Sequence, residues 1–174
     1  MKNRVIIIIA IISLILSGSK IAYADNMLSD SKIQSIKDSC KNIEVQIRKI
    51  RSKDALKRVK LGGQYENLSN NLMARFNARI ALNHMTSINL SSLAVEFNRN
   101  LQYFKNNYQN YEREITNLTK ISCSKEPNNF YDQLIRVRKA KDEVNFNMDK
   151  LLKVAENYKK EVGVFKEGLI NEKK

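Results

Sequence analysis

Two cysteines, Cys40 and Cys123, are the residues of this 174-residue chain that could form a specific covalent link. They lie too far apart in sequence for a redox-active CxxC pair. The chain has no HExxH motif, no phosphate-binding glycine loop and no nucleophile elbow. Its single histidine, His84, has no second histidine with which to build a metal or catalytic site. We therefore expect no enzymatic activity, no cofactor, no metal ion and no small-molecule substrate.

The N-terminus predicts the compartment in which the cysteines are found. Lys2 and Arg4 precede an apolar run over residues 5–16, and an Ala-Tyr-Ala sequence ends at Ala24. These are the three parts of a secretory signal peptide, and the apolar run is short for a bilayer core of about 30 Å. We expect cleavage after Ala24 and export to the periplasm, cell surface or extracellular medium. An uncleaved N-terminal membrane anchor is the alternative.

The remaining residues, 25–174, are predicted to form a single helical domain behind the signal peptide of residues 1–24. Apolar periodicity places helices at roughly 28–84, 90–121 and 128–170. The clearest seam follows Pro127 in alternating steps of four and three residues: Phe130, Leu134, Val137, Lys141, Val144, Met148, Leu151, Ala155, Tyr158, Val162, Phe165 and Leu169. Because only Lys141 interrupts this heptad pattern, we predict an all-α fold, an elongated antiparallel three-helix bundle or coiled coil.

The aromatic residues of the middle helix are predicted to lie in the core. Phe97, Phe104, Tyr108 and Tyr111 share the apolar stripe of this helix, and only Tyr103 lies outside it. A surface that stacks on nucleic-acid bases needs exposed rings. The pattern therefore favours a core seam over base stacking.

The first helix contains the Gly62-Gly63 pair, where we expect a kink. Beyond the pair, Leu68, Leu72, Phe76 and Ile80 resume an apolar stripe. Straight antiparallel helices would leave the two cysteines roughly 16 Å apart at about 1.5 Å per residue, whereas a disulfide tolerates about 7 Å between α-carbons. A kink at the glycines and an extended segment over 122–126 could close this gap. The alternative is a first helix that folds back at the glycines, with no bond.

With the gap closed, we expect a Cys40–Cys123 disulfide, because an exported chain meets an oxidising environment.

Positive charge is the main indication of a binding partner. Removing Lys2, Arg4 and Lys20 with the signal peptide lowers the formal net charge from +13 to +10. The candidate anion-binding residues are Arg48, Lys49, Arg51, Lys53, Lys57, Arg58, Lys60, Arg136, Arg138 and Lys139. In the bundle they would gather at one end of the rod and attract an anionic polymer or a membrane surface. A solvated helix face, or a genome biased toward lysine, would give the same composition.

An apolar overhang is the second candidate surface. If the middle helix is the shortest, Ile33, Ile36, Ile43 and Ile47 extend past it without a complete set of partners. Uncovered apolar stripes usually mark interfaces, so we expect self-association or binding to another envelope protein. The expected function is an exported helical interaction or structural module of the bacterial cell envelope. The alternatives are a cationic binder of anionic envelope polymers, lipid or nucleic acid, and a periplasmic holdase-like chaperone.

One combination of residues resembles a known group of proteins. It comprises the spacing Cys123-x3-Pro127-x2-Phe130-x3-Leu134-x3-Arg138, with Cys40 upstream and Tyr65-x2-Leu68-x3-Leu72 between. Over roughly residues 40–144 the chain is similar to small exported helical proteins of Patescibacteria, notably Saccharibacteria. The resemblance implies a signal peptide, paired cysteines and three long helices. It carries no activity and no catalytic residue.

Overall fold

The computed structural model describes residues 28–171, which are almost entirely helical. The elements are α2 (Asp30–Asn67), the π-helical segment η1 (Leu68–Met73), α3 (Ala74–Leu82), α4 (Ile88–Leu118) and α5 (Pro127–Asn171). Residues 28–171 contain no β-strand, so the predicted all-α class is confirmed. The predicted signal peptide, residues 1–24, lies outside this part of the chain.

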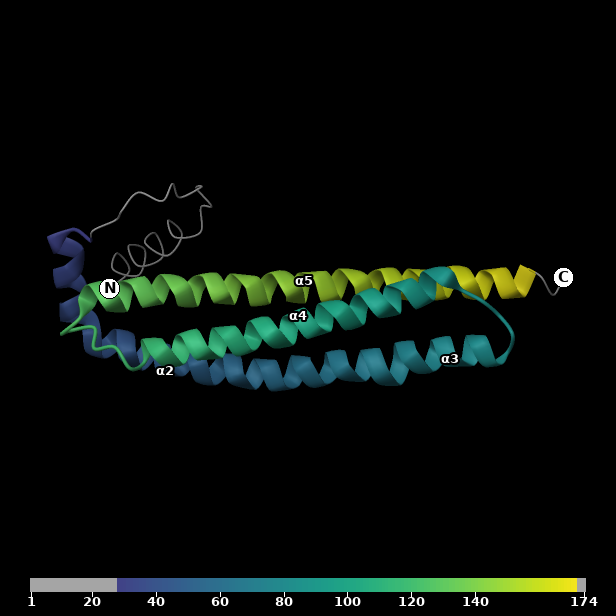
Figure 1. Cartoon of the computed structure of the whole chain (residues 1–174), viewed down its shortest axis with the longest axis horizontal. Helices are drawn as coiled ribbons and strands as arrows, with labels where there is room; N and C mark the ends of the chain where they lie inside the picture. The colour runs from purple at the N-terminus through teal and green to yellow at the C-terminus, as the bar shows by residue number, and fades with distance from the viewer. Residues whose placement is uncertain (1–27, 172–174) are drawn as a thin grey trace, which may run out of the picture.

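The helices form an elongated up-down-up bundle (Figure 1). α2, η1 and α3 follow one another as one long rod, α4 runs back along it, and α5 returns parallel to α2. Two contacts fix the levels of the outer helices: Asp54 of α2 meets Lys141 of α5, and Phe76 of α3 meets Phe165 of α5. α4 and α5 pack against each other far more extensively than α2 packs against either. The α4–α5 hairpin is therefore the body of the molecule.

Local chemistry sets the ends of the helices at the two turns. The backbone N–H of Leu90 donates to the side-chain oxygen of Ser87 (3.4 Å), which caps the start of α4. His84 ends the first rod with a φ of 57°, a left-handed conformation that histidine adopts more readily than β-branched residues do. Pro127 begins α5, where its missing N–H leaves no helical hydrogen bond unmade. These residues restrict both turns to short connections.

Aromatic rings from α2 and α4 fill the centre of the bundle. Phe97, Phe104 and Tyr111 are each at most 2% exposed, whereas Tyr103 is 52% exposed. The ring of Tyr65 meets those of Phe97 and Phe104 edge to face, at centroid distances of 6.4 and 5.6 Å. The expectation that the aromatic stripe of the middle helix is core is confirmed. Among residues 28–171, no helix is both long enough and apolar enough to cross a membrane.

α5 is contacted on two sides, which explains its interrupted seam. The side-chain amide of Gln133 donates to the backbone oxygen of Glu114 in α4 (2.9 Å). Lys141, four residues and one turn beyond Val137, instead donates to Asp54 of α2 (2.8 Å). The buried positions of α5 include Gln133, Ala140, Asn147 and Val154, which the sequence pattern did not place in the core. One side of the heptad seam of α5 therefore packs against α4, and the other side packs against α2.

The predicted kink at Gly62-Gly63 is not found. α2 remains α-helical through both glycines to Asn67, and the first rod does not fold back. Two helical glycines cost about 2 kcal/mol relative to alanine. Burying the ring of Tyr65 contributes about 3 kcal/mol, and Leu61 packs against the core as well. Packing on both sides of the pair therefore holds the helix together.

The irregular turn occurs instead at η1, five residues after Gly63. A π-helical turn is wider than an α-helical one and shifts the buried face by one residue. Met73 is consequently 1% exposed, whereas Leu72, expected on the apolar stripe, is 57% exposed. Ser69 is buried one turn before Met73. The first helix thus keeps its core contacts over its full length without a kink.

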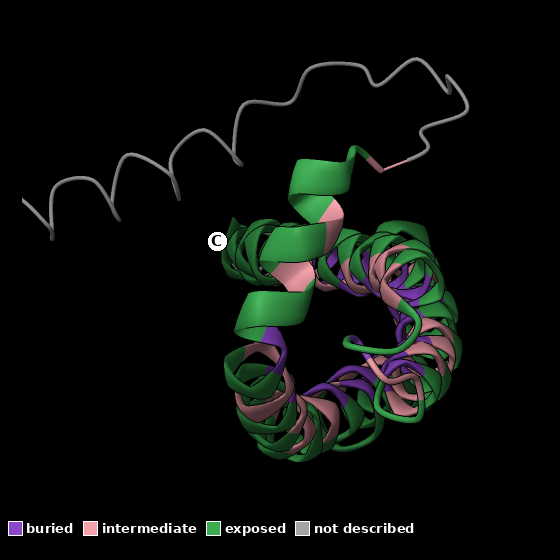
Figure 2. Ribbon diagram, turned by 90° about the vertical axis from the view of Figure 1, so that its left-hand side faces the viewer, coloured by how far each residue is buried: buried purple, intermediate pink, exposed green. Residues whose placement is uncertain are grey.

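The start of α2 lies across one end of the bundle. Figures 1 and 2 show its first turns bending away from the long axis and passing over the end at which α4 finishes and α5 begins. The helix stays hydrogen-bonded throughout. This bend, rather than a kink at the glycines, brings Cys40 to the connection between α4 and α5.

Candidate functional site

The predicted disulfide is confirmed. Cys40 and Cys123 are bonded, with their α-carbons 5.5 Å apart, across 83 residues of sequence. Both are buried, and Cys123 is fully inaccessible. Cys40 comes from the bent start of α2, and Cys123 comes from the connection of residues 119–126. The bond therefore ties the first helix to the α4–α5 hairpin at one end of the rod.

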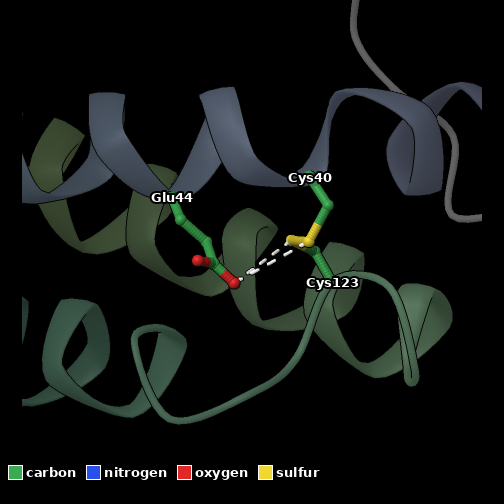
Figure 3. Close-up of side chains that lie close together, drawn as sticks. All are labelled: Cys40, Glu44 and Cys123. Carbon is green, nitrogen blue, oxygen red and sulfur yellow. Dashed lines mark hydrogen bonds between the residues drawn. A yellow bond between two sulfur atoms is a disulfide. The ribbon is translucent and has the colours of Figure 1, made fainter.

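Glu44 lies directly beside the disulfide (Figure 3). Its Oε1 atom is 3.7 Å from each sulfur, a van der Waals contact because disulfide sulfurs carry no proton to donate. The ligand atoms of Cys40, Glu44 and Cys123 all lie within 4.8 Å of one another. Metal binding by cysteine requires the thiolate, which the disulfide removes. The oxidised end of the rod is therefore a structural link.

The predicted apolar overhang is largely covered by the chain itself. Ile47 is 8% exposed and belongs to the core. Ile36 and Ile43 are half-buried and pack against the core, and Ile33 is half-buried near the start of α2. The overhang was expected because straight helices would leave these residues uncovered. The bend of α2 across the end of the bundle removes that free surface.

The seven cations of residues 48–60 divide into two groups, and the arginines form the first. Each contacts a partner within the chain: Arg48 with Glu44 (3.9 Å), Arg51 with Glu112 (3.7 Å), and Arg58 with the ring of Tyr108 (5.0 Å to the centroid). Such exposed contacts contribute little stability, at most about 1 kcal/mol each. They do hold Arg51 and Arg58 against α4.

The lysines form the second group. Lys49, Lys53, Lys57 and Lys60, here called the lysine stripe, are all exposed. At about 100° per residue they fall within an arc of about 80° and extend about 16 Å along α2. None of them forms an ion pair within residues 28–171. The structure therefore presents four unpaired positive charges on one side of a single regular helix.

The three cations predicted on the last helix do not all join this surface. Arg136, Arg138 and Lys139 are exposed, but successive residues of a helix point about 100° apart. Arg138 lies one turn before Lys141, on the side of α5 that faces α2. Arg136 and Lys139 point to other sides. The ten predicted residues are thus one stripe on α2, one neighbour on α5, and several residues engaged or directed elsewhere.

A polar cluster between the three helices was missed by the sequence reasoning. The Tyr111 hydroxyl donates to Asp54 Oδ2 (2.7 Å), and Lys141 Nζ donates to the same oxygen (2.8 Å). The side chain of Asp54 is 17% exposed and that of Lys141 is 41% exposed. A signal was present, because Asp54 and Lys141 each interrupt an apolar heptad with opposite charge. The cluster joins α2, α4 and α5 at one level.

Burial changes the acidity of the tyrosines in and beside this cluster. The pKa of Tyr111 is raised well above its usual value by burial first, and then by its hydrogen bond to the Asp54 carboxylate. Burial also raises the pKa of Tyr108, with further contributions from the charge of Glu112 and from the hydrogen bond between them. Both phenols are therefore neutral donors at physiological pH.

Two of the hollows in the described part of the chain are lined by charged side chains. The first lies against the Asp54 cluster, is lined by Lys57, Tyr108 and Met148 among others, and encloses about 40 Å³. That is room for a few water molecules, whereas metabolite sites are typically about 300–1,000 Å³. The second is an open depression of about 450 Å³ between α4 and α5, whose lining includes Glu96, Arg99 and Lys153. Neither is lined by a serine, threonine, cysteine or histidine side chain.

Comparisons with known protein families, with curated proteins and with solved structures find no match for this chain.

Proposed function

We propose that this protein is a non-catalytic helical interaction module of a bacterial cell envelope, and that it engages an anionic partner through the lysine stripe. One observation carries the proposal. The cations of residues 48–60 are sorted, so that the arginines contact the protein and the lysines remain unpaired on one exposed side of α2. A merely solvated face would not require this division.

The rigidity of the bundle makes the stripe effective. α2 holds its lysines at fixed spacing, so that binding an anion orders only the side chains and not the backbone. Like charges held together raise the local positive potential and attract polyanions over about 10 Å at 0.1 M salt. Arg138 of α5 adds to the field on the side that faces α2.

The exported location rests on the signal-peptide pattern of residues 1–24. The Cys40–Cys123 disulfide is compatible with it, because such bonds persist in oxidising compartments. The expectation of no catalysis is supported by the small size of the cavity between the helices and by linings without a serine, threonine, cysteine or histidine in the two hollows described above. Kinship with the exported helical proteins of Saccharibacteria stays a prediction.

Retention of residues 25–174 on an anionic matrix tests the proposal. The test variant changes the lysine stripe to glutamine: Lys49→Gln, Lys53→Gln, Lys57→Gln and Lys60→Gln. The matched control removes the same charge from exposed lysines of α5: Lys150→Gln, Lys153→Gln, Lys159→Gln and Lys160→Gln.

We expect the stripe variant to elute at much lower salt than the wild-type protein and the control variant. Equal losses in the two variants would mean that net charge alone governs retention, and the proposal would then be wrong. Circular dichroism checks that both variants stay helical, as expected for exposed positions.

A further inference from the structure

The outer side of α2 combines its free lysines with exposed aliphatic side chains. Leu56 is 72% exposed and Val59 is 70% exposed. Both point away from the buried side of the helix, on which Ile47 and Tyr65 lie. At about 100° per residue, Leu56 lies about 20° from Lys49, and Val59 lies about 60° beyond Leu56. The aliphatic residues and the lysine stripe therefore form one continuous face.

Gly63 extends this face by one turn. It follows Val59 at i+4, is exposed, and has no atom within 4 Å of the position that a Cβ would occupy. Arg48 borders the opposite edge, where it pairs with Glu44 on its own helix. The outer face of α2 thus has Leu56, Val59 and Gly63 along its middle, with the lysine stripe on the side toward α5.

We propose that the outer face of α2 lies on the surface of a lipid bilayer that contains anionic lipids. The lysine ammonium groups contact the headgroup phosphates, and Leu56 and Val59 insert between the headgroups. The rod then lies parallel to the membrane surface. This inference rests on the proposed function and names the anionic partner as lipid.

Charge complementarity and the aliphatic pair together argue for lipid. Each lysine near an anionic surface contributes about a fivefold gain in partitioning. A linear polyanion would also use the lysines, but it offers no apolar phase for Leu56 and Val59. Interfacial helices combine these two elements, a basic flank and exposed aliphatic residues. Phe146 of α5 is also exposed (56%), but only Lys150 lies over its ring (4.4 Å to the centroid), and the acidic residues Asp142 and Asp149 stand one turn away on either side.

Co-sedimentation of residues 25–174 with vesicles tests the inference. One set of vesicles contains phosphatidylglycerol and phosphatidylcholine, and the other contains phosphatidylcholine alone. The test variants are the lysine-stripe quadruple variant and the double variant Leu56→Ser/Val59→Ser. The apolar control is Leu152→Ser/Val164→Ser, which changes exposed residues of α5 (51% and 61%). The charge control is the α5 quadruple variant. Retention on single-stranded DNA is measured in parallel.

We expect wild-type protein to bind the anionic vesicles and not the neutral ones. The stripe variant should lose at least about 100-fold in partitioning. Leu56→Ser/Val59→Ser should lose about tenfold on vesicles, while its retention on single-stranded DNA stays unchanged. The two controls should change vesicle binding by less than about threefold.

Two other outcomes overturn the inference, and they differ in what they leave standing. If Leu56→Ser/Val59→Ser binds vesicles as wild type does, while the stripe variant loses both vesicle and DNA binding, the partner is a polyanion rather than a bilayer. The proposed function then stands. If the lysine-stripe variant and the α5 quadruple variant lose binding equally, both to vesicles and to single-stranded DNA, then the proposed lipid surface and the proposed function are both wrong.

Discussion

Removing the Cys40–Cys123 bond should destabilise the protein substantially. The bond closes 83 residues of sequence, and the chain-entropy relation gives about 4.5 kcal/mol for a loop of that length. Most domains of this size have a free energy of unfolding of about 5–15 kcal/mol. Reduction should therefore remove a large part of the stability without substituting any residue.

The effect should also be local in the native state. The first turns of α2 lie across the end of the bundle and are held there by the bond and by the half-buried Ile36 and Ile43. Once the bond is reduced, residues 30–46 should open without unfolding of the α4–α5 hairpin. Amide hydrogen exchange should then accelerate over this segment, while the amides of Phe104 and Leu151 stay protected.

Urea unfolding of the oxidised and reduced chain, residues 25–174, supplies the measurement. The midpoint should fall and the m-value should rise on reduction, because the reduced denatured state exposes more surface. Cys40→Ala/Cys123→Ala should reproduce the change, with a small addition for the lost sulfur packing. The reasoning is refuted if reduction changes the free energy of unfolding by less than about 1 kcal/mol and leaves exchange over residues 30–46 unaltered.

Three further predictions concern the interior and the long first helix. Gly62→Ala and Gly63→Ala should each stabilise the protein by about 0.5–1 kcal/mol in thermal or urea unfolding, because each glycine is helical with open space at its Cβ position. Asp54→Ala should lower the free energy of unfolding by about 2–3 kcal/mol because the buried Tyr111 hydroxyl loses its acceptor, whereas Tyr111→Phe/Asp54→Leu/Lys141→Met should be nearly neutral in the same measurement because no buried polar group is left unpaired. Since the pKa of Tyr111 is raised above its ordinary value of 10.0, stability from this group should be constant below pH 10 and fall above it; an alkaline loss of stability that is unchanged in the Tyr111→Phe variant would contradict this.

The class of fold could be predicted from the sequence because the burial of apolar side chains is the main determinant of that class. The heptad positions Phe130, Val137, Val144, Leu151 and Tyr158 are all buried as the periodicity predicted. Their burial is far larger in energy than the local preferences that might break a helix. For that reason the number and extent of the long helices could be read from the pattern alone.

The details that failed depend on contacts between distant residues. Gly62 and Gly63 suggest a kink only until the packing of Tyr65 is known. Met73 rather than Leu72 is buried because of a π-helical turn, which the apolar periodicity of the sequence does not indicate. The bend of α2 depends on the packing of its first turns across the end of the bundle and not on any residue at the bend itself.

For the candidate site, the sequence identified the basic segment of residues 48–60. It did not show that the arginines contact the protein and the lysines stay unpaired. Helical angles measured from Ile47 would have separated Lys49, Lys53 and Lys60 from Arg51 and Arg58. What the arginines contact, and therefore which cations remain free, required the positions of α4 residues. The opposite charges of Asp54 and Lys141 were visible in the sequence, but that they lie at the same level along the rod required the packing of α2 against α5.

The position of the disulfide also determines how the protein would respond to tension between its two ends. The bond connects residue 40 directly to residue 123, so a pull on residues 28 and 171 bypasses everything between the cysteines. At about 3.4 Å per residue, full extension of the described chain would reach roughly 200 Å with the bond intact and roughly 490 Å without it. Such a pull therefore stretches α5 along its own axis from Cys123 to residue 171, while α4 and the part of α2 beyond Cys40 lie outside the covalent path of the force. When the protein is held at both ends, tension is carried by residues 28–40 and by α5, and the lysine stripe lies outside the path of the force.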